Sequence, residues 1–136
     1  DARMILVDTS VWVSVLRDKT GNVVAAFRKR VGSEVTVLSR FNQLELLQGA
    51  KNVREGQMLE EYLATQIYLE ASSGTWREAA RIYFDLRREG ITVSSPVDCC
   101  IAQVALESGA LLLHCDHDFE RIAKVRKVEE EFFAWE

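Results

Sequence analysis

The sequence predicts a three-layer α/β/α sandwich with a mostly parallel central sheet. Two short runs, residues 4–7 and 111–113, are apolar at every position, as strands buried on both faces are. Segments with helical spacing of apolar residues separate the predicted strands, and this alternation is typical of βαβ units. No linker, repeat or low-complexity run interrupts the chain, so residues 1–136 are expected to form a single domain.

The predicted strands are short and apolar. They are expected over residues 4–7, 35–38, 67–69 and 111–114. After the last predicted helix, three consecutive glutamates at 129–131 add an acidic tail. Met4 is a candidate natural start, with Asp1, Ala2 and Arg3 as an added or upstream extension.

The predicted helices are bounded by residues that commonly start or stop helices. Thr9 or Ser10 can cap the first helix and Ser39 the third, and Ser95 can cap the helix whose first position is Pro96. The helices are expected over about residues 11–16, 25–27, 40–48, 58–63, 75–89, 96–108 and 119–123.

Four carboxylates occupy positions that are unusual for an acid. Asp8 ends the first apolar run, Asp116 follows the last one, Asp98 shares the apolar face of its helix, and Glu45 borders an apolar stripe. The carboxyl ends of parallel strands meet at one edge of a sheet, so Asp8 and Asp116 are expected to lie together. Carboxylates that converge repel one another unless a cation holds them, and Mg²⁺ or Mn²⁺ suits an all-oxygen site.

Each acid also has an ordinary structural interpretation. Asp8 could favour a helix N-terminus through the macrodipole, and Glu45 could be a solvated boundary residue beside the stripe of Phe41, Leu44 and Leu47. Asp98 stands where a reciprocal cap with Ser95 is plausible. The Asp116-x-Asp118 pair could reflect turn chemistry alone.

Composition narrows the functional classes. The formal net charge is −4, which does not by itself indicate a nucleic-acid binder. Basic clusters at 28–30, 87–88 and 121–127 are either phosphate contacts or solvated helix faces. No apolar run approaches the roughly 20 residues of a membrane span. Three cysteines, an odd number, indicate reduced thiols and a cytoplasmic protein without a membrane partner.

The four acidic segments together resemble the motifs of a known family. The chain resembles PIN-domain ribonucleases, specifically the VapC-type toxins of bacterial toxin–antitoxin pairs, from Met4 to about Ile122. The order and spacing of four motifs carry this resemblance. They are Ile5-Leu6-Val7-Asp8-Thr9-Ser10-Val11-Trp12, Glu45-Leu46-Leu47-x-Gly49, Val97-Asp98-Cys99-Cys100-Ile101-Ala102 and Leu113-His114-Cys115-Asp116-His117-Asp118-Phe119.

The resemblance implies an endoribonuclease that depends on Mg²⁺ or Mn²⁺ and cleaves RNA with an activated water. It implies Asp8 and Asp98 as direct metal ligands, with Asp116 and a fifth acid, Asp118, completing a second ion site or binding through water. Glu45 would hold or help deprotonate the attacking water. Ser10 is either a helix cap or a residue that orients Asp8. The resemblance also implies a homodimer, and an antitoxin whose peptide blocks the acidic site, often with an arginine.

Several rival interpretations compete with the ribonuclease. His114, Cys115 and His117 could form part of a zinc site, but no second ligand pair is apparent. Another Mg²⁺-dependent phosphate-transfer domain would also use clustered acids, although haloacid-dehalogenase-type phosphatases carry Asp-x-Asp on the first strand. A catalytically inactive interaction module of the same fold would leave the five acids unexplained. Aromatic residues at helical spacing, including Trp12 and Trp76, are mainly expected in the core.

Overall fold

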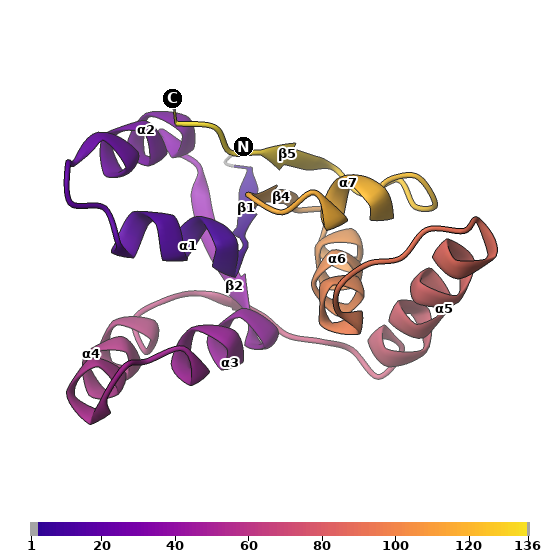
Figure 1. The fold of residues 1–136 in the computed structure, drawn as a ribbon, viewed down its shortest axis with the longest axis horizontal. Helices are drawn as coiled ribbons and strands as arrows, with labels where there is room; N and C mark the ends of the chain where they lie inside the picture. Colours follow the sequence, from indigo (N-terminus) through magenta and orange to yellow (C-terminus); the bar gives the residue numbers. More distant parts are fainter. Residues whose placement is uncertain (1–2, 136) are drawn as a thin grey trace.

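The computed structural model describes residues 3–135 (Figure 1). Asp1 and Ala2, from the expected N-terminal extension, lie outside the described residues, as does Glu136. Five parallel strands form one sheet in the order β3-β2-β1-β4-β5. The strands are β1 (Met4–Val7), β2 (Val35–Ser39), β3 (Tyr68–Leu69), β4 (Leu111–His114) and β5 (Glu130–Phe132).

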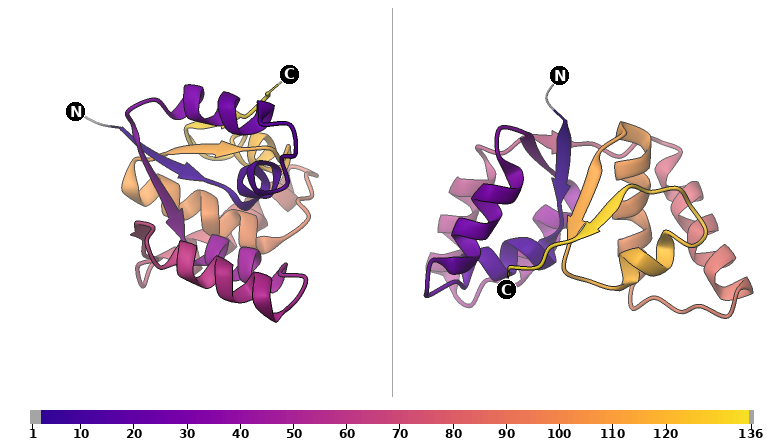
Figure 2. Two further views of the ribbon diagram at one scale, coloured as in Figure 1. Left: turned by 90° about the vertical axis from the view of Figure 1, so that its left-hand side faces the viewer. Right: turned by 90° about the horizontal axis from the view of Figure 1, so that it is seen from above.

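Seven helices accompany these strands in the described part of the chain. They are α1 (Thr9–Leu16), α2 (Asn22–Val31), α3 (Arg40–Gln48), α4 (Val53–Leu63), α5 (Thr75–Arg88), α6 (Pro96–Ser108) and α7 (Asp118–Ile122). The right-hand view of Figure 2 shows α1 and α2 on one side of the strands and α5, α6 and α7 on the other. The predicted three-layer α/β/α sandwich is therefore confirmed, and every strand pairing is parallel.

Two apolar cores explain why the central strands are apolar at every position. Successive side chains of a strand point to opposite faces of the sheet. Leu6 and Leu112 accordingly belong to the core under α5 and α6, whereas Ile5, Val7 and Leu113 belong to the core under α1 and α2. Both faces of β1 and β4 are thus sealed from water. None of the helices in residues 3–135 is long and apolar enough to cross a membrane.

The expectation of an acidic tail at residues 129–131 is wrong for Glu130 and Glu131, because both belong to strand β5. Leu113 pairs with Glu131 in a parallel register, and Arg30 donates two hydrogen bonds to the Glu131 carboxylate at 2.6 and 2.8 Å. Glu130 contacts the buried His114 ring at 2.7 Å. Arg30 thus neutralises Glu131 and the His114 ring donates to Glu130, so partners distant in sequence allow the acidic run to pair as a strand.

The structure also corrects two expectations about helices. The residue that caps α1 is Asp8 and not Thr9 or Ser10, because the Asp8 carboxylate accepts the backbone N–H of Ser10 at 3.0 Å. Trp76 is 58% exposed on α5, so this aromatic residue does not belong to the core. The expected cap of α3 by Ser39 is confirmed.

Candidate active site

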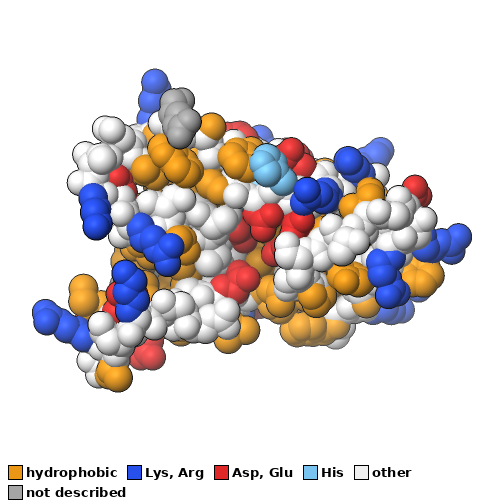
Figure 3. Space-filling model, in the orientation of Figure 1, with side chains coloured by type: hydrophobic (Ala, Val, Ile, Leu, Met, Phe, Trp, Pro, Cys, Tyr) orange, Lys and Arg blue, Asp and Glu red, His pale blue; other side chains and the backbone are white. Residues whose placement is uncertain are grey.

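The carboxyl edge of the sheet gathers the five candidate acids. Asp8 and Asp116 follow β1 and β4, and these neighbouring strands pair in parallel. Glu45 comes from α3, Asp98 from the first turn of α6, and Asp118 from the start of α7. Acidic side chains form a patch near the centre of the face in Figure 3. Short connections after the strands place acids from separate segments at this edge.

Three of these acids can act together on one ion. One carboxylate oxygen from each of Asp98, Asp116 and Asp118 lies within 4.8 Å of the other two. Asp98 is only 8% exposed, and no hydrogen bond to its carboxylate is found within residues 3–135. Burial raises the pKa of Asp98 to about 8, and the charges of Asp116, Asp8, Asp118 and Glu45 contribute to the same rise.

Asp98 does not form the reciprocal cap with Ser95 that would explain it as a purely structural residue. Ser95 caps α6 by accepting the backbone N–H of Val97 at 3.1 Å. A reciprocal cap would need the Asp98 side chain to bond the backbone of Ser95, and no such bond occurs among the described residues. The Asp98 carboxylate is therefore a buried acid that lacks compensation by neighbouring donors.

Asp118, in contrast, has compensating partners. Arg121 donates to one carboxylate oxygen at 2.6 Å, and both the backbone N–H and the hydroxyl of Ser94 donate to the other. Burial opposes ionisation, but the Ser94 and Arg121 bonds outweigh it and lower the pKa of Asp118. The backbone N–H of Asp118 also donates to Asp116 at 2.9 Å, which orients the Asp116 carboxylate.

Asp8 is held in a fixed orientation from both sides. The Ser10 hydroxyl donates to one of its oxygens at 2.6 Å, and the Asn42 amide donates to the other at 3.2 Å. Ser10 in turn accepts the backbone N–H of Cys115 at 2.9 Å, so one hydroxyl links Asp8 to the segment that carries Asp116. Burial raises the pKa of Asp8 despite the hydrogen bonds from Ser10. Asp8 lies outside the group of three that share the 4.8 Å spacing.

Glu45 stands beside this network on the inner side of α3. The Thr9 hydroxyl donates to the Glu45 carboxylate at 2.7 Å. Burial raises the pKa of Glu45 despite this bond, and the charges of Asp8 and Asp116 raise it further. The stripe expected beside Glu45 is partly wrong, because Leu44 is 59% exposed while Asn42 and Leu46 are buried. The inward face of α3 is therefore polar where it meets the site.

Four residues of this network are not among the site residues that the sequence predicts. They are Thr9, Asn42, Ser94 and Arg121. Asn42 had a signal, because it stands three residues after the cap Ser39 and three before Glu45 on one helical turn. The buried Asn42 amide accepts from Ser39 and donates to both Asp8 and Thr9. Ser94 carries no comparable local signal, since it meets Asp118 only through the fold.

The donor set fits a hard divalent cation. All the convergent groups are carboxylates, and such oxygen ligands suit Mg²⁺ or Mn²⁺. Burial is the main cause of the elevated pKa of Asp98, and the neighbouring negative charges add to it; a bound cation would offset both effects. The zinc alternative loses support: the fully buried His114 contacts Glu130, whereas the His117 side chain is 68% exposed and stacks on Phe132.

Comparisons with known proteins agree with this geometry. A family model described as PIN domain matches residues 5–125. Ribonuclease VapC11 of Mycobacterium tuberculosis is 35% identical over 130 residues, which cover 93% of this chain and 96% of that protein. A VapC ribonuclease of Mycobacterium bovis matches equally well.

Solved structures share the fold at lower identity. VapBC from Salmonella typhimurium, bound to DNA, has a TM-score of 0.77 at 21% identity and covers 98% of this chain and 100% of that one. VapBC-5 from M. tuberculosis, described as a member of a family of toxin–antitoxin systems, has a TM-score of 0.65 at 19% identity and covers 96% of this chain and 97% of that one.

The fold and its edge of acids therefore define a PIN domain. The chain belongs to the PIN-domain family. Within that family it belongs to the VapC ribonucleases, and the expected family resemblance is confirmed over nearly the whole chain.

Proposed function

We propose that this protein is an endoribonuclease that cleaves RNA phosphodiester bonds with an activated water and acts as the toxin of a toxin–antitoxin pair. The observation that carries the proposal is the convergence of Asp8, Glu45, Asp98, Asp116 and Asp118 at one edge of the sheet, with the pKa of Asp98 raised to about 8. Its relatives at 35% identity are named ribonucleases.

The cofactor is proposed to be Mg²⁺ or Mn²⁺. Asp98, Asp116 and Asp118 would hold it, and Asp8, at the end of the neighbouring strand β1, would complete the acidic site. A bound ion of this type lowers the pKa of a water molecule and stabilises charge on the leaving oxygen.

The remaining residues would orient the reacting groups. Glu45, held by Thr9, would position the attacking water and accept its proton, since burial raises the pKa of this carboxyl group. Ser10 and Asn42 would keep Asp8 in one orientation by donating to both of its oxygens.

An antitoxin is the proposed protein partner. A groove of about 900 Å³ lies between α1, α3 and α4, and Glu45 lines it together with apolar residues such as Leu16, Met58 and Tyr62. Figure 3 shows a hollow on this side of the molecule. A peptide in this groove could therefore bring an arginine to the carboxylates, where its planar guanidinium can form paired hydrogen bonds.

We also propose a homodimer in the cytoplasm. Trp76 and Phe84 on α5 and Leu44 on α3 are exposed apolar side chains that an interface could cover. Light scattering of the purified protein would test this, and a monomer at all concentrations would contradict the dimer.

The decisive experiment is cleavage of RNA by the purified chain. Cleavage is expected with Mg²⁺ or Mn²⁺, is expected to stop with EDTA, and should be absent from the Asp98→Asn variant. Glu61→Gln, which alters an exposed carboxylate on α4, serves as the matched control and should cleave normally. Full activity in chelator would contradict the metal-assisted reaction. An intact but inactive wild type would instead favour an interaction module, and hydrolysis of small phosphate esters in place of RNA would favour another phosphate-transfer domain.

A further inference from the structure

The motif that carries Asp116 and Asp118 also presents an aromatic surface. His117 lies between the two acids in the chain, and its ring stacks on Phe132 of β5 with centroids 4.8 Å apart and planes 18° apart. The His117 side chain is 68% exposed, and Phe132 is 39% exposed. Two flat rings are therefore stacked beside the acids in contact with solvent.

Contacts below and beside the pair hold it in place. Phe132 pairs with His114 in the sheet, and the His114 ring meets the Phe132 ring edge-on at 5.7 Å. The backbone N–H of Asp116 donates to His114 Nδ1, so the His114 Nε2–H donates to Glu130 at 2.7 Å. Glu120 accepts from His117 Nδ1 at 2.8 Å and restricts rotation of that ring. A ligand that stacks on His117 would thus meet a surface that is already ordered, which lowers the entropic cost of binding.

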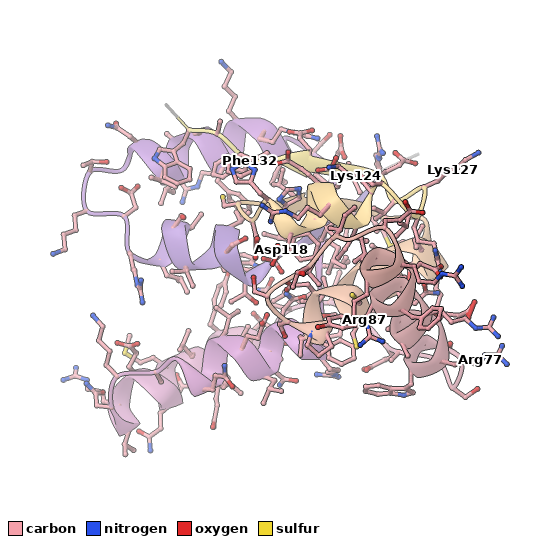
Figure 4. All side chains as sticks on the ribbon, turned by 45° about the vertical axis from the view of Figure 1, so that its right-hand side comes forward. Arg77, Arg87, Asp118, Lys124, Lys127 and Phe132 are labelled. Atoms are coloured by element: carbon pink, nitrogen blue, oxygen red, sulfur yellow. The ribbon has the colours of Figure 1, made fainter. Side chains whose placement is uncertain are left out.

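Positive charges continue along the same side of the molecule. Figure 4 shows Phe132, Lys124 and Lys127 along one side, above Asp118. Lys124 and Lys127 are exposed and lie in the segment between α7 and β5. Binding sites for single-stranded nucleic acids usually combine aromatic rings, on which bases stack, with cationic side chains along the path of the sugar–phosphate backbone.

We propose that His117, backed by Phe132, is the stacking platform for an unpaired RNA base next to the scissile phosphate. This inference rests on the proposed function and adds the position of one nucleotide. Because His117 stands between Asp116 and Asp118 in the chain, a base on its free face would belong to a nucleotide close to the carboxylates. Single-stranded RNA is recognised largely through bases stacked on such rings.

The first test compares steady-state cleavage of a single-stranded RNA by four variants in Mg²⁺. His117→Ala and Phe132→Ala are expected to raise KM at least about fivefold with little change in kcat, the lower limit of base stacking on an aromatic ring. His117→Phe should restore KM because it keeps a flat ring. Ile67→Ala removes an exposed apolar side chain just before β3, at the opposite edge of the sheet from β5, and should leave KM unchanged.

The second test removes the stacked base from the RNA instead of removing the His117 ring from the protein. An RNA with an abasic nucleotide beside the cleaved bond should raise the KM of the wild type by about the same factor as His117→Ala raises it for the intact RNA. The abasic RNA and His117→Ala together should raise KM no more than either change alone. If the two factors in KM multiply when the changes are combined, the base does not stack on His117 and the proposal is overturned. Wild-type KM values in both His117→Ala and Phe132→Ala would also overturn it, as would changes confined to inhibition by an antitoxin. Absence of RNA cleavage by the wild type would instead refute the proposed function itself.

Discussion

Replacement of Asp98 by asparagine is expected to stabilise the metal-free protein at neutral pH while abolishing activity. Asp98 is 8% exposed and shares the edge of the sheet with four other acids. Burial and these neighbouring charges raise its pKa from 3.8 to about 8. The folded protein therefore keeps a proton on Asp98 between these two values, whereas the unfolded chain releases it.

The sign and size of the effect follow from this difference in proton binding. When the folded state binds more protons than the unfolded state, stability falls as the pH rises, by about 1.4 kcal/mol per pH unit for one group. The loss begins above the unfolded pKa of 3.8 and is complete above the folded value of about 8. Between pH 5 and pH 7, Asp98 alone would remove roughly 2.6 kcal/mol, and at pH 7 its total cost is about 4 kcal/mol.

Asparagine eliminates this cost but introduces a buried amide. An amide without hydrogen-bond partners costs about 1–3 kcal/mol, so the net gain at pH 7 is expected to be roughly 1–3 kcal/mol. The variant should also lose the part of the pH dependence that Asp98 contributes between pH 5 and pH 8, whereas Asp8 and Glu45, whose pKa values are raised by burial, keep their own contributions. Added Mg²⁺ should stabilise the wild type and have a much smaller effect on the variant.

Urea denaturation in EDTA at pH 5, 6, 7 and 8 would measure these free energies of unfolding. The exposed-carboxylate control Glu61→Gln should follow the wild type at every pH. A wild-type stability that does not change between pH 5 and pH 7 would refute the electrostatic reasoning. An Asp98→Asn variant less stable than the wild type at pH 7 would show that the carboxylate supports the helix.

Three further predictions concern the partners of the acids. Asp118→Asn should destabilise the metal-free protein by about 1–2 kcal/mol, because it weakens the bonds from Arg121 and Ser94; denaturation that shows a gain like that of Asp98→Asn would contradict this. Ser10→Ala should weaken Mg²⁺ binding measured by calorimetry and cost about 1 kcal/mol of stability, since it frees Asp8 and leaves the Cys115 N–H unpaired; unchanged Mg²⁺ affinity would remove Ser10 from the site. Inhibition of RNA cleavage by an arginine-containing antitoxin peptide should weaken as the concentration of Mg²⁺ or salt rises, and a peptide with lysine in place of that arginine should inhibit less well. An inhibition constant that does not change with Mg²⁺ would place the blocking contact elsewhere in the groove between α1, α3 and α4.

The sequence alone determined the fold class and the edge at which the acids meet. Runs such as residues 4–7 and 111–113 are apolar at every position because both faces of their strands are buried, and that local pattern needs no knowledge of partners. Since parallel strands end at one edge, the positions of Asp8 and Asp116 after two such runs predicted their proximity. Asp98 followed from its place in the first turn of a helix with an apolar face.

Only the tertiary structure decided which acids are compensated. Asp98 and Asp118 are the same residue type at the start of two helices, yet their pKa values move in opposite directions. The difference arises from Ser94 and Arg121, and the contact between Ser94 and Asp118 forms only when the segment before α6 reaches α7. Local sequence cannot report such a contact because a single fold-dependent hydrogen bond leaves no periodic pattern.

The same reason explains the errors at the sheet edge and on α3. Glu130 and Glu131 have a low intrinsic tendency to form a strand, and only the contacts with His114 and Arg30 allow them to pair beside β4. Asn42 is a polar residue on a buried helical face, where its amide joins Asp8 to the rest of the site. Periodicity identifies buried faces through apolar residues, so a face that is polar because it serves a site becomes visible only once the chain has folded.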